Sequence, residues 1–409
     1  MPPKDEESTQ KAAEQQAASS YWHLPLSLQQ FFFFLLVPPL TLYGAFTTTL
    51  HPFTAVATLL MYIFTGLGIT AGYHRLWAHR SYEAAAPLRA LLALAGASSF
   101  QGSILWWSRH HRAHHRWTDT DKDPYDARKG LFWSHIGWLL FHIPPEDRPR
   151  VDSRDLENDP IVMWQHRNFM LVGPFMALVV PTLIAGLGWG DWRGGYIYVG
   201  LLRMCAVHQT TFCVNSLAHY FGETSYGDRL TPRDHVITAL VTFGEGYHNF
   251  HHEFPNDYRN AVYWWQYDPT KWFIWACSCI GLAHGLRRFP DNEIRKGRVR
   301  MDEKRVWEAK QGIDWGPATK DLPCYTMQEV RDMCKHDGRL WVVIDGAIID
   351  VSSFARNHPG GERLIRAACG RDATGDFNGG VHLHRDVARQ MLSTMRVGLV
   401  DNQPEASDI

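Results

Sequence analysis

The chain has 409 residues, 45% of them apolar, and a formal net charge of -1 at pH 7. It is long enough for two domains, and its near-zero net charge gives no electrostatic case for binding nucleic acid. The seven cysteines are scattered and include no Cys-x-x-Cys pair, so they suggest neither a zinc ribbon nor a disulfide framework.

Residues 1–24 form a polar tail of mixed charge, without the basic-then-apolar pattern of a cleavable signal peptide. No Asp, Glu, Lys or Arg occurs from Gln15 to His74, a stretch too long and too apolar for one buried soluble helix. We predict two membrane-spanning helices here, at about residues 28–48 and 53–73, joined by a short turn that contains threonines, a histidine and a proline.

A second pair of membrane helices is predicted at about residues 168–190 and 194–219, with a short charged segment between them. Two such hairpins place the N-terminus, the polar segment after the second helix and everything after the fourth helix on one face of the membrane. The many Lys and Arg residues of these segments predict that this face is cytosolic. Arg203 is costly in lipid, so we expect it to face the protein interior in a structural role.

Histidines gather in three short motifs that all fall on this face. Positions i, i+3 and i+4 of a helix project from one side, so three imidazoles at this spacing form a ridge. Two ridges and one further pair supply eight nitrogen ligands, more than one metal ion needs and enough for two. Ordinary surface histidines would explain one such motif but hardly three. The motifs contain His74 and His79, then His111, His114 and His115, then His248, His251 and His252.

The motifs and the residues around them resemble the membrane acyl-CoA desaturases over roughly residues 25–290. This resemblance implies a mainly α fold, in which a four-transmembrane-helix di-iron desaturase domain carries a cytosolic cap. It also implies a ninth iron ligand at His219 and a residue that holds a metal through water at Asn215. Matching segments are Gly72 to Arg80, Asp119 to Asp126, Ser134 to Leu140 and Gly244 to Pro255.

The same resemblance implies that O2 is used to insert a cis double bond between C9 and C10 of a saturated acyl-CoA. In the family a bent tunnel holds the acyl chain, and the residues at its bend correspond to Gln101, Trp107 and Thr211. Its closed end corresponds to Tyr62, which would suit chains of about 16 to 18 carbons. Arg109 corresponds to an arginine near the CoA phosphates.

The chain departs from the family pattern around the CoA headgroup. An acidic residue that follows the arginine in animal members is replaced by His110. Neither His110 nor His235 has a place in the ligand pattern, so we expect both to be non-ligands. The family's headgroup contacts therefore transfer poorly to this sequence.

A charged, helix-favouring stretch marks residues 291–323 as a linker. From 324 to 400 an α+β pattern follows, centred on a His-Pro-Gly-Gly motif that begins at His358. This segment resembles cytochrome b5, which implies a haem b held by His358 and a second histidine, for which His384 fits the family pattern better than His382. Two histidine ligands leave the haem iron no open position, which favours electron transfer over oxygen binding.

The sequence shows no persuasive flavin or nicotinamide site, so we expect a separate NADH-cytochrome b5 reductase as the electron source. The resemblance implies a multi-pass protein of the endoplasmic reticulum membrane, with both termini, including a tail at 401–409, in the cytosol. A membrane fatty-acid hydroxylase shares histidine-rich motifs, but its b5-like domain usually comes first. A second alternative is a non-catalytic, anchored haem electron carrier whose histidines bind structural metal.

Overall fold

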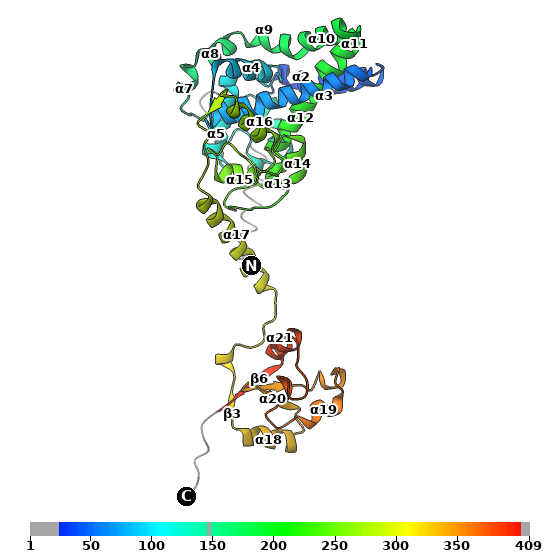
Figure 1. The fold of residues 1–409 in the computed structure, drawn as a ribbon, viewed down its shortest axis with the longest axis vertical. Helices are drawn as coiled ribbons and strands as arrows, with labels where there is room; N and C mark the ends of the chain where they lie inside the picture. Colours follow the sequence, from blue (N-terminus) through cyan, green and yellow to red (C-terminus); the bar gives the residue numbers. More distant parts are fainter. Residues whose placement is uncertain (1–23, 145–148, 402–409) are drawn as a thin grey trace. The chain divides into compact units, whose positions relative to one another are not determined.

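The computed structural model describes residues 24–144 and 149–401 (Figure 1). The tails predicted at 1–24 and 401–409 lie almost entirely outside the described residues. Within the chain the structure separates two compact units, with the boundary between Lys304 and Arg305.

Four helical segments in the described part of the first unit are long and apolar enough to cross a membrane. Their lengths of 19, 27, 21 and 29 residues meet or nearly meet the roughly 20 residues that the hydrocarbon core requires. The second span continues to Ala78, beyond the end predicted at residue 73, because its helix extends past the apolar stretch. The four spans are Leu28–Phe46, Pro52–Ala78, Phe169–Trp189 and Trp192–Tyr220.

Three of these spans change from α-helical to π-helical hydrogen bonding along their length. A π-helix bonds residue i to residue i+5 and is usually confined to a single turn, often at a functional site. The first span is α2 (Leu28–Phe46), and the second joins α3 (Pro52–Leu67) to η1 (Gly68–Ala78). The third contains α9 (Phe169–Pro174), η5 (Phe175–Val179) and α10 (Val180–Trp189). The fourth contains α11 (Trp192–Gly194), η6 (Gly195–Leu202), α12 (Arg203–Asn215) and α13 (Leu217–Tyr220).

A short apolar helix, α4 (Ala86–Ala97), packs closely against η1. A Cβ added to Gly68 would lie 2.2 Å from the backbone nitrogen of Gly96, so only glycine permits this approach. Small residues allow helix backbones to approach in this way within membranes. The contact fixes η1, which carries the first histidine motif.

Polar segments between and after the spans form the rest of the first unit. Ser103 caps α5 (Ile104–Trp117) by accepting a hydrogen bond from the backbone of Trp106. The other helices here are η2 (Ala127–Lys129), η3 (Trp133–Gly137), α6 (Trp138–Leu140), α7 (Arg154–Glu157) and α8 (Pro160–Arg167), followed by α14 (Val236–Val241), α15 (His248–Glu253) and α16 (Pro269–Cys279). A small antiparallel sheet joins β1 (Glu83–Ala84) to β2 (Ala283–His284).

The charged segment predicted as a linker begins as a long helix, α17 (Asp291–Gln311). Its first half packs on the first unit, because Ile294 is buried in a cluster with Tyr226, Phe250 and Phe254. The segment predicted as a linker therefore begins as a helix, and part of this helix belongs to the core of the first unit.

The second unit is a four-stranded sheet with helices, in the strand order β3-β6-β5-β4. Strand β5 pairs antiparallel with both β4 and β6, and β3 runs parallel to β6. Asp345 and Gly346 have φ of 50° and 75°, the conformation of a tight hairpin turn between β4 and β5. The predicted mainly α fold with a C-terminal α+β domain is confirmed. The strands are β3 (Cys324–Tyr325), β4 (Trp341–Ile344), β5 (Ala347–Asp350) and β6 (Arg396–Val400). The helices are η7 (Thr319–Asp321), α18 (Met327–His336), η8 (Ala355–Asn357), α19 (Glu362–Ala367), α20 (Thr374–Phe377) and α21 (Asp386–Met395).

Candidate metal and haem sites

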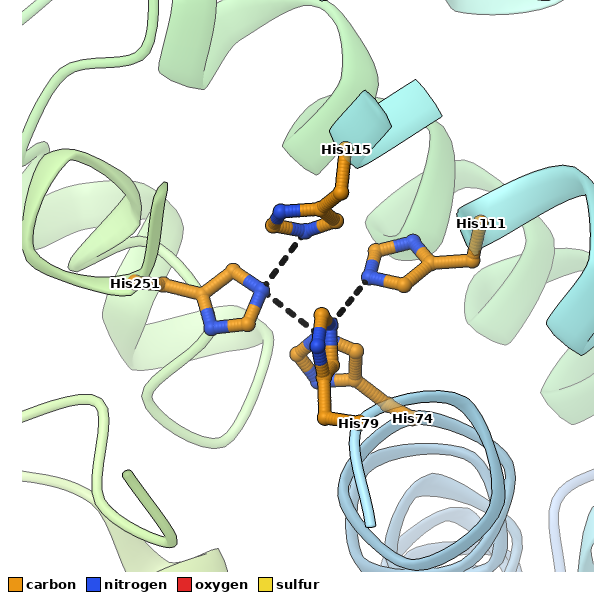
Figure 2. A group of neighbouring side chains, drawn as sticks. All are labelled: His74, His79, His111, His115 and His251. Carbon is orange, nitrogen blue, oxygen red and sulfur yellow. Dashed lines mark hydrogen bonds between the residues drawn. The ribbon is translucent and has the colours of Figure 1, made fainter. Parts of the chain in front are cut away.

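The nine histidines predicted to bind metal converge into two groups. In each group the ligand nitrogens all lie within 4.8 Å of one another. Most of these side chains are buried, in keeping with a site that excludes water. The first group contains His74, His79, His111, His115 and His251 (Figure 2). The second contains His114, His219, His248 and His252.

The spacing of the nitrogens fits metal ligands. In Figure 2, Nε2 of His251 lies 3.0 Å from Nε2 of His74 and 2.9 Å from Nε2 of His115. Nε2 of His79 lies 2.8 Å from Nε2 of His111. Two nitrogens bound at a right angle to an ion about 2.1 Å away would lie about 3 Å apart.

The π-helix η1 explains how His74 and His79 reach the same group. In an α-helix with 3.6 residues per turn, positions five apart point about 140° away from each other. In a π-helix they nearly coincide, and the backbone N–H of His79 donates to the carbonyl of His74 at 3.0 Å. Their ring centres lie 4.7 Å apart. The π-helical bonding, which the spacing alone did not predict, therefore brings His74 and His79 into the same group.

Each histidine ridge is divided between the two groups. On α5, His111 and His115 enter the first group and His114 enters the second. On α15, His251 enters the first group, whereas His248 and His252 enter the second. The i, i+3 and i+4 positions of one helix thus belong to different groups, and α5 and α15 each contribute histidines to both groups.

Several of the histidines have an outer partner at Nδ1. Nδ1 of His114 lies 2.8 Å from Oδ1 of Asp123, and Nδ1 of His219 lies 2.7 Å from Oγ1 of Thr231. Nδ1 of His74 lies 2.7 Å from Oε2 of Glu245. An acceptor at Nδ1 places the ring proton there and leaves the Nε2 lone pair directed inward. Facing lone pairs cannot hydrogen-bond to each other, so these inward nitrogens fit a bound cation.

Burial sets the protonation of the groups around the two sites. Burial works against ionisation of Glu245, but its contacts with His74 and Arg75 lower the pKa of its carboxyl to about 2. Burial, followed by the charge of Asp126, raises the pKa of Asp123. Neutral imidazole is the form that binds metal. Burial lowers the pKa of His79, His111, His114, His115, His248, His251 and His252.

Asn215 is the last residue of α12, and the helix breaks at Ser216 before His219. Nδ1 of His135, from η3, lies 2.9 Å from Oγ of Ser216 and supports this break. The Asn215 side chain lines a cavity together with His111 and His248. Asn215 therefore lies beside a member of each histidine group.

Two cavities lie beside the histidines: one of about 580 Å³, called the wide arm, and one of about 50 Å³, called the narrow arm. Both arms are lined by Trp107, His111, Thr211 and Asn215, so these residues lie where the two cavities adjoin. Trp107 stacks on His111 with ring centres 5.0 Å apart.

Two further predicted substrate residues lie on separate arms. Gln101 lines the wide arm, and its Nε2 donates to Oγ1 of Thr211 at 3.0 Å. Tyr62 lines the narrow arm, and its hydroxyl donates to the carbonyl of Val241 at 2.7 Å. The predicted bend and end residues therefore line these two adjoining cavities.

In the second unit, His358 and His384 face each other across 6.4 Å between ring centres, with their planes 24° apart. Two imidazoles that bind one iron from opposite sides, through bonds of about 2.1 Å, place their nitrogens about 4 Å apart and their ring centres farther. The observed spacing therefore fits bis-histidine haem ligation. Nδ1 of His384 lies 2.9 Å from the carbonyl of Phe377, which directs Nε2 toward the other ring. His382 is exposed.

Comparison with known proteins gives the family. Residues 49–281 match the fatty acid desaturase family, and residues 326–401 match the cytochrome b5-like haem/steroid-binding domain. The chain belongs to the fatty acid desaturase family. Its two histidine groups are typical of a di-iron desaturase, and its second unit contains a b5 haem-binding domain.

The desaturase is similar along most of its length to two fungal proteins. It is 50% identical over 366 residues to the probable acyl-CoA desaturase of Schizosaccharomyces pombe, covering 89% of this chain and 75% of that protein. It is 46% identical over 381 residues to acyl-CoA desaturase 1 of Saccharomyces cerevisiae, covering 93% and 74%. Human stearoyl-CoA desaturase 5 is 41% identical over 255 residues, covering 61% and 77%.

His110 and Arg109 are neighbours in the sequence, but their side chains have different surroundings. His110 lines the wide arm, whereas the Arg109 guanidinium pairs with Glu157 and donates to Oγ of Ser153 at 2.9 Å. Nδ1 of His235 lies 2.8 Å from Oγ1 of Thr238, and His235 belongs to neither metal group in the described residues.

The outer carboxylates Glu245 and Asp123 were not predicted. Glu245 is held by Arg75, whose Nη2 lies 2.9 Å from Oε1 of Glu245 and 2.9 Å from Oδ1 of Asp268. One signal in the sequence was the position of Glu245, three residues before His248 of the third motif. No comparable spacing pointed to Asp123 over its acidic neighbours.

Proposed function

We propose that this desaturase inserts a cis double bond between C9 and C10 of a saturated acyl-CoA. The preferred chain would have about 16 to 18 carbons, because Tyr62, in the wall of the narrow arm, corresponds to the closed end of the family's tunnel. The main observation for this proposal is that His111 and Asn215 line both adjoining cavities, beside the two histidine groups. A di-iron centre, when bound, would supply the activation of O2 that no side chain can provide.

In this proposal each histidine group holds one iron, and Asn215 joins the second group through water. Two opposed ligand sets suit a pair of ions that share one substrate between them. The buried side chains around them exclude water from the site. His358 and His384 hold haem b in the second unit.

The cavity walls would position the acyl chain. The apolar Trp107 ring lines both arms, and the hydrogen bond from Gln101 to Thr211 fixes another part of the wall of the wide arm. Tyr62 stops the chain at the end of the narrow arm. Because the distance from this stop to the histidine groups is set by packed helices, the reacting carbon pair is selected by geometry.

We also propose Arg109 as a contact for the CoA phosphates. Its side chain is 43% exposed, but the neighbouring carboxylate of Glu157 offsets its charge. A phosphate would have to compete with Glu157 for the guanidinium. We therefore expect Arg109 to affect KM more than kcat.

The proposed electron source is an NADH-cytochrome b5 reductase, which delivers electrons to the haem of the second unit. The proposed location is the endoplasmic reticulum membrane, with both termini in the cytosol. The support is that the histidine motifs lie at or beyond the ends of the second and fourth spans, so that both hairpins return to one face.

To test the proposal, the chain is expressed in membranes that lack desaturase activity and supplied with stearoyl-CoA, NADH, reductase and O2. Products are identified by mass spectrometry. We expect the 9-cis monoene from the unchanged chain and from His235→Ala, which alters a histidine outside both groups. His114→Ala and His384→Ala should each abolish it.

The alternatives give different products. A hydroxylated chain would assign the site to hydroxylation. A haem that is reduced by NADH and reductase while stearoyl-CoA stays unchanged would reject catalysis and favour an electron carrier.

A further inference from the structure

The turn that presents Gln101 to the cavity has an unusual backbone. It runs from Ser98 to Gly102 between α4 and α5, and φ is 55° at Phe100 and 93° at Gly102. Positive φ is uncommon for a bulky residue such as phenylalanine. Such a conformation persists only where the surrounding structure holds it.

Arg203 holds the first carbonyl of this turn. Its side chain is 1% exposed in the middle of the fourth span, and none of its contacts is to a carboxylate in the described residues. Its guanidinium donates to the carbonyls of Ser98 at 2.5 Å and Ala177 at 2.7 Å, and to Oγ1 of Thr65 at 3.2 Å. A cation at this depth is costly and is usually kept for a specific task.

His208 holds the next carbonyl. Its Nε2 donates to the carbonyl of Ser99 at 2.7 Å, from the same helix that carries Arg203. Two successive carbonyls just before the strained residue Phe100 are therefore tied to α12. The residue after Phe100 is also bonded to α12, because Gln101 donates a hydrogen bond to Thr211.

One helix thus relates the turn to the metal site. Arg203, Thr211 and Asn215 lie at intervals of eight and four residues along α12. A helix rises about 1.5 Å per residue, so Thr211 and Asn215 are about 6 Å apart along its axis. The distance from the turn to Asn215 therefore depends on where the turn is attached to α12.

We propose that Arg203 and His208 are positioning residues that attach this turn to α12 and so determine which carbon pair of the acyl chain faces the histidine groups. The inference rests on the function proposed above. A slip of the turn by about one helical residue, about 1.5 Å, is comparable to the length of one carbon–carbon bond. Misplacements of that size change reaction rates strongly.

The test compares the positions of the double bonds made by His208→Phe and Arg203→Lys. Phenylalanine keeps a ring among Phe33, Phe34 and Phe212 but removes the donor. Lysine keeps the charge but cannot form the same planar fork. Both variants are assayed with stearoyl-CoA, and double bonds are located by mass spectrometry of dimethyl disulfide adducts. We expect the share of 8- and 10-monoenes to rise to on the order of one tenth.

Tyr198→Phe is the matched control. The Tyr198 hydroxyl donates to the carbonyls of Ala45 at 2.6 Å and Thr48 at 2.5 Å, so this variant also removes a buried bond to backbone, but one that involves neither the turn nor α12. It should make only the 9-monoene, even if less of it. Iron content and the haem spectrum report whether each variant is folded and loaded.

The outcomes separate the two hypotheses. If the unchanged chain and both variants make only the 9-monoene, whatever the yield, the positioning role is wrong and the proposed function stands. If the unchanged chain makes no 9-monoene, the proposed function fails and the inference fails with it. If Arg203→Lys does not accumulate, the product of His208→Phe decides.

Discussion

The carboxylate of Asp123 should control how tightly the second histidine group holds its metal. Asp123 is 3% exposed, and its Oδ1 lies 2.8 Å from Nδ1 of His114 and 3.2 Å from the backbone nitrogen of Tyr125. Asp123→Asn keeps the shape but removes the carboxyl group that lies against Nδ1 of His114 and orients its ring. Loss of such an outer partner typically lowers metal affinity about 10- to 100-fold. This corresponds to about 1.4 to 2.8 kcal/mol of binding free energy.

Dialysis against increasing chelator concentrations measures this effect, with iron counted per haem by mass spectrometry. For Asp123→Asn we expect one of two irons to leave at a chelator concentration about 10- to 100-fold lower than for the unchanged chain. The second iron should leave at the same concentration in both proteins, because the first group does not contact Asp123. The matched control is Asp121→Asn, which alters a side chain of the same loop that is 90% exposed.

Two results would contradict this reasoning. If Asp123→Asn keeps both irons at the chelator concentration that the unchanged chain withstands, the carboxylate does not support the ligand. If both irons leave together, the two groups do not act as separate metal sites.

Three further predictions test other parts of the chain. Tyr62→Ala should lengthen the narrow arm, and room for two more methylenes, at about 0.8 kcal/mol each, should raise the ratio of C20 to C18 products roughly tenfold; an unchanged ratio would show that Tyr62 is not the stop. His384→Ala should abolish the haem Soret band and His382→Ala should keep it, and the reverse result would exchange their roles. Burial raises the pKa of Asp234 to about 6 from 3.8, so the folded chain holds a proton that the unfolded chain releases, and stability falls as the pH rises through this window. The Asp234→Asn variant has no such proton, so it does not lose this stability. Its Tm minus that of the unchanged chain should therefore increase between pH 5 and about pH 7, by the equivalent of on the order of 1 to 2 kcal/mol of unfolding free energy. A Tm difference that stays constant over this range would contradict the prediction.

Local patterns were sufficient for much of this protein. The four spans follow from apolar composition over lengths that suit a bilayer, and the ridges on α5 and α15 follow from spacing within a few residues. The motif that begins at His358 likewise lies within one short segment. Neighbouring residues determine these features, because helix periodicity and the transfer of apolar side chains into the bilayer both depend on short stretches of sequence.

Tertiary structure decided how these pieces combine. His74 meets His251 across 177 residues of sequence, and no periodicity relates them. The pairing of His74 with His79 depends on π-helical bonding in η1, which local composition did not predict. The partners of Arg203 likewise come from other helices of the membrane unit. Sequence alone determined which side chains could bind metal, whereas packing decided which of them lie in the same group, because only packing brings distant segments within a few ångströms.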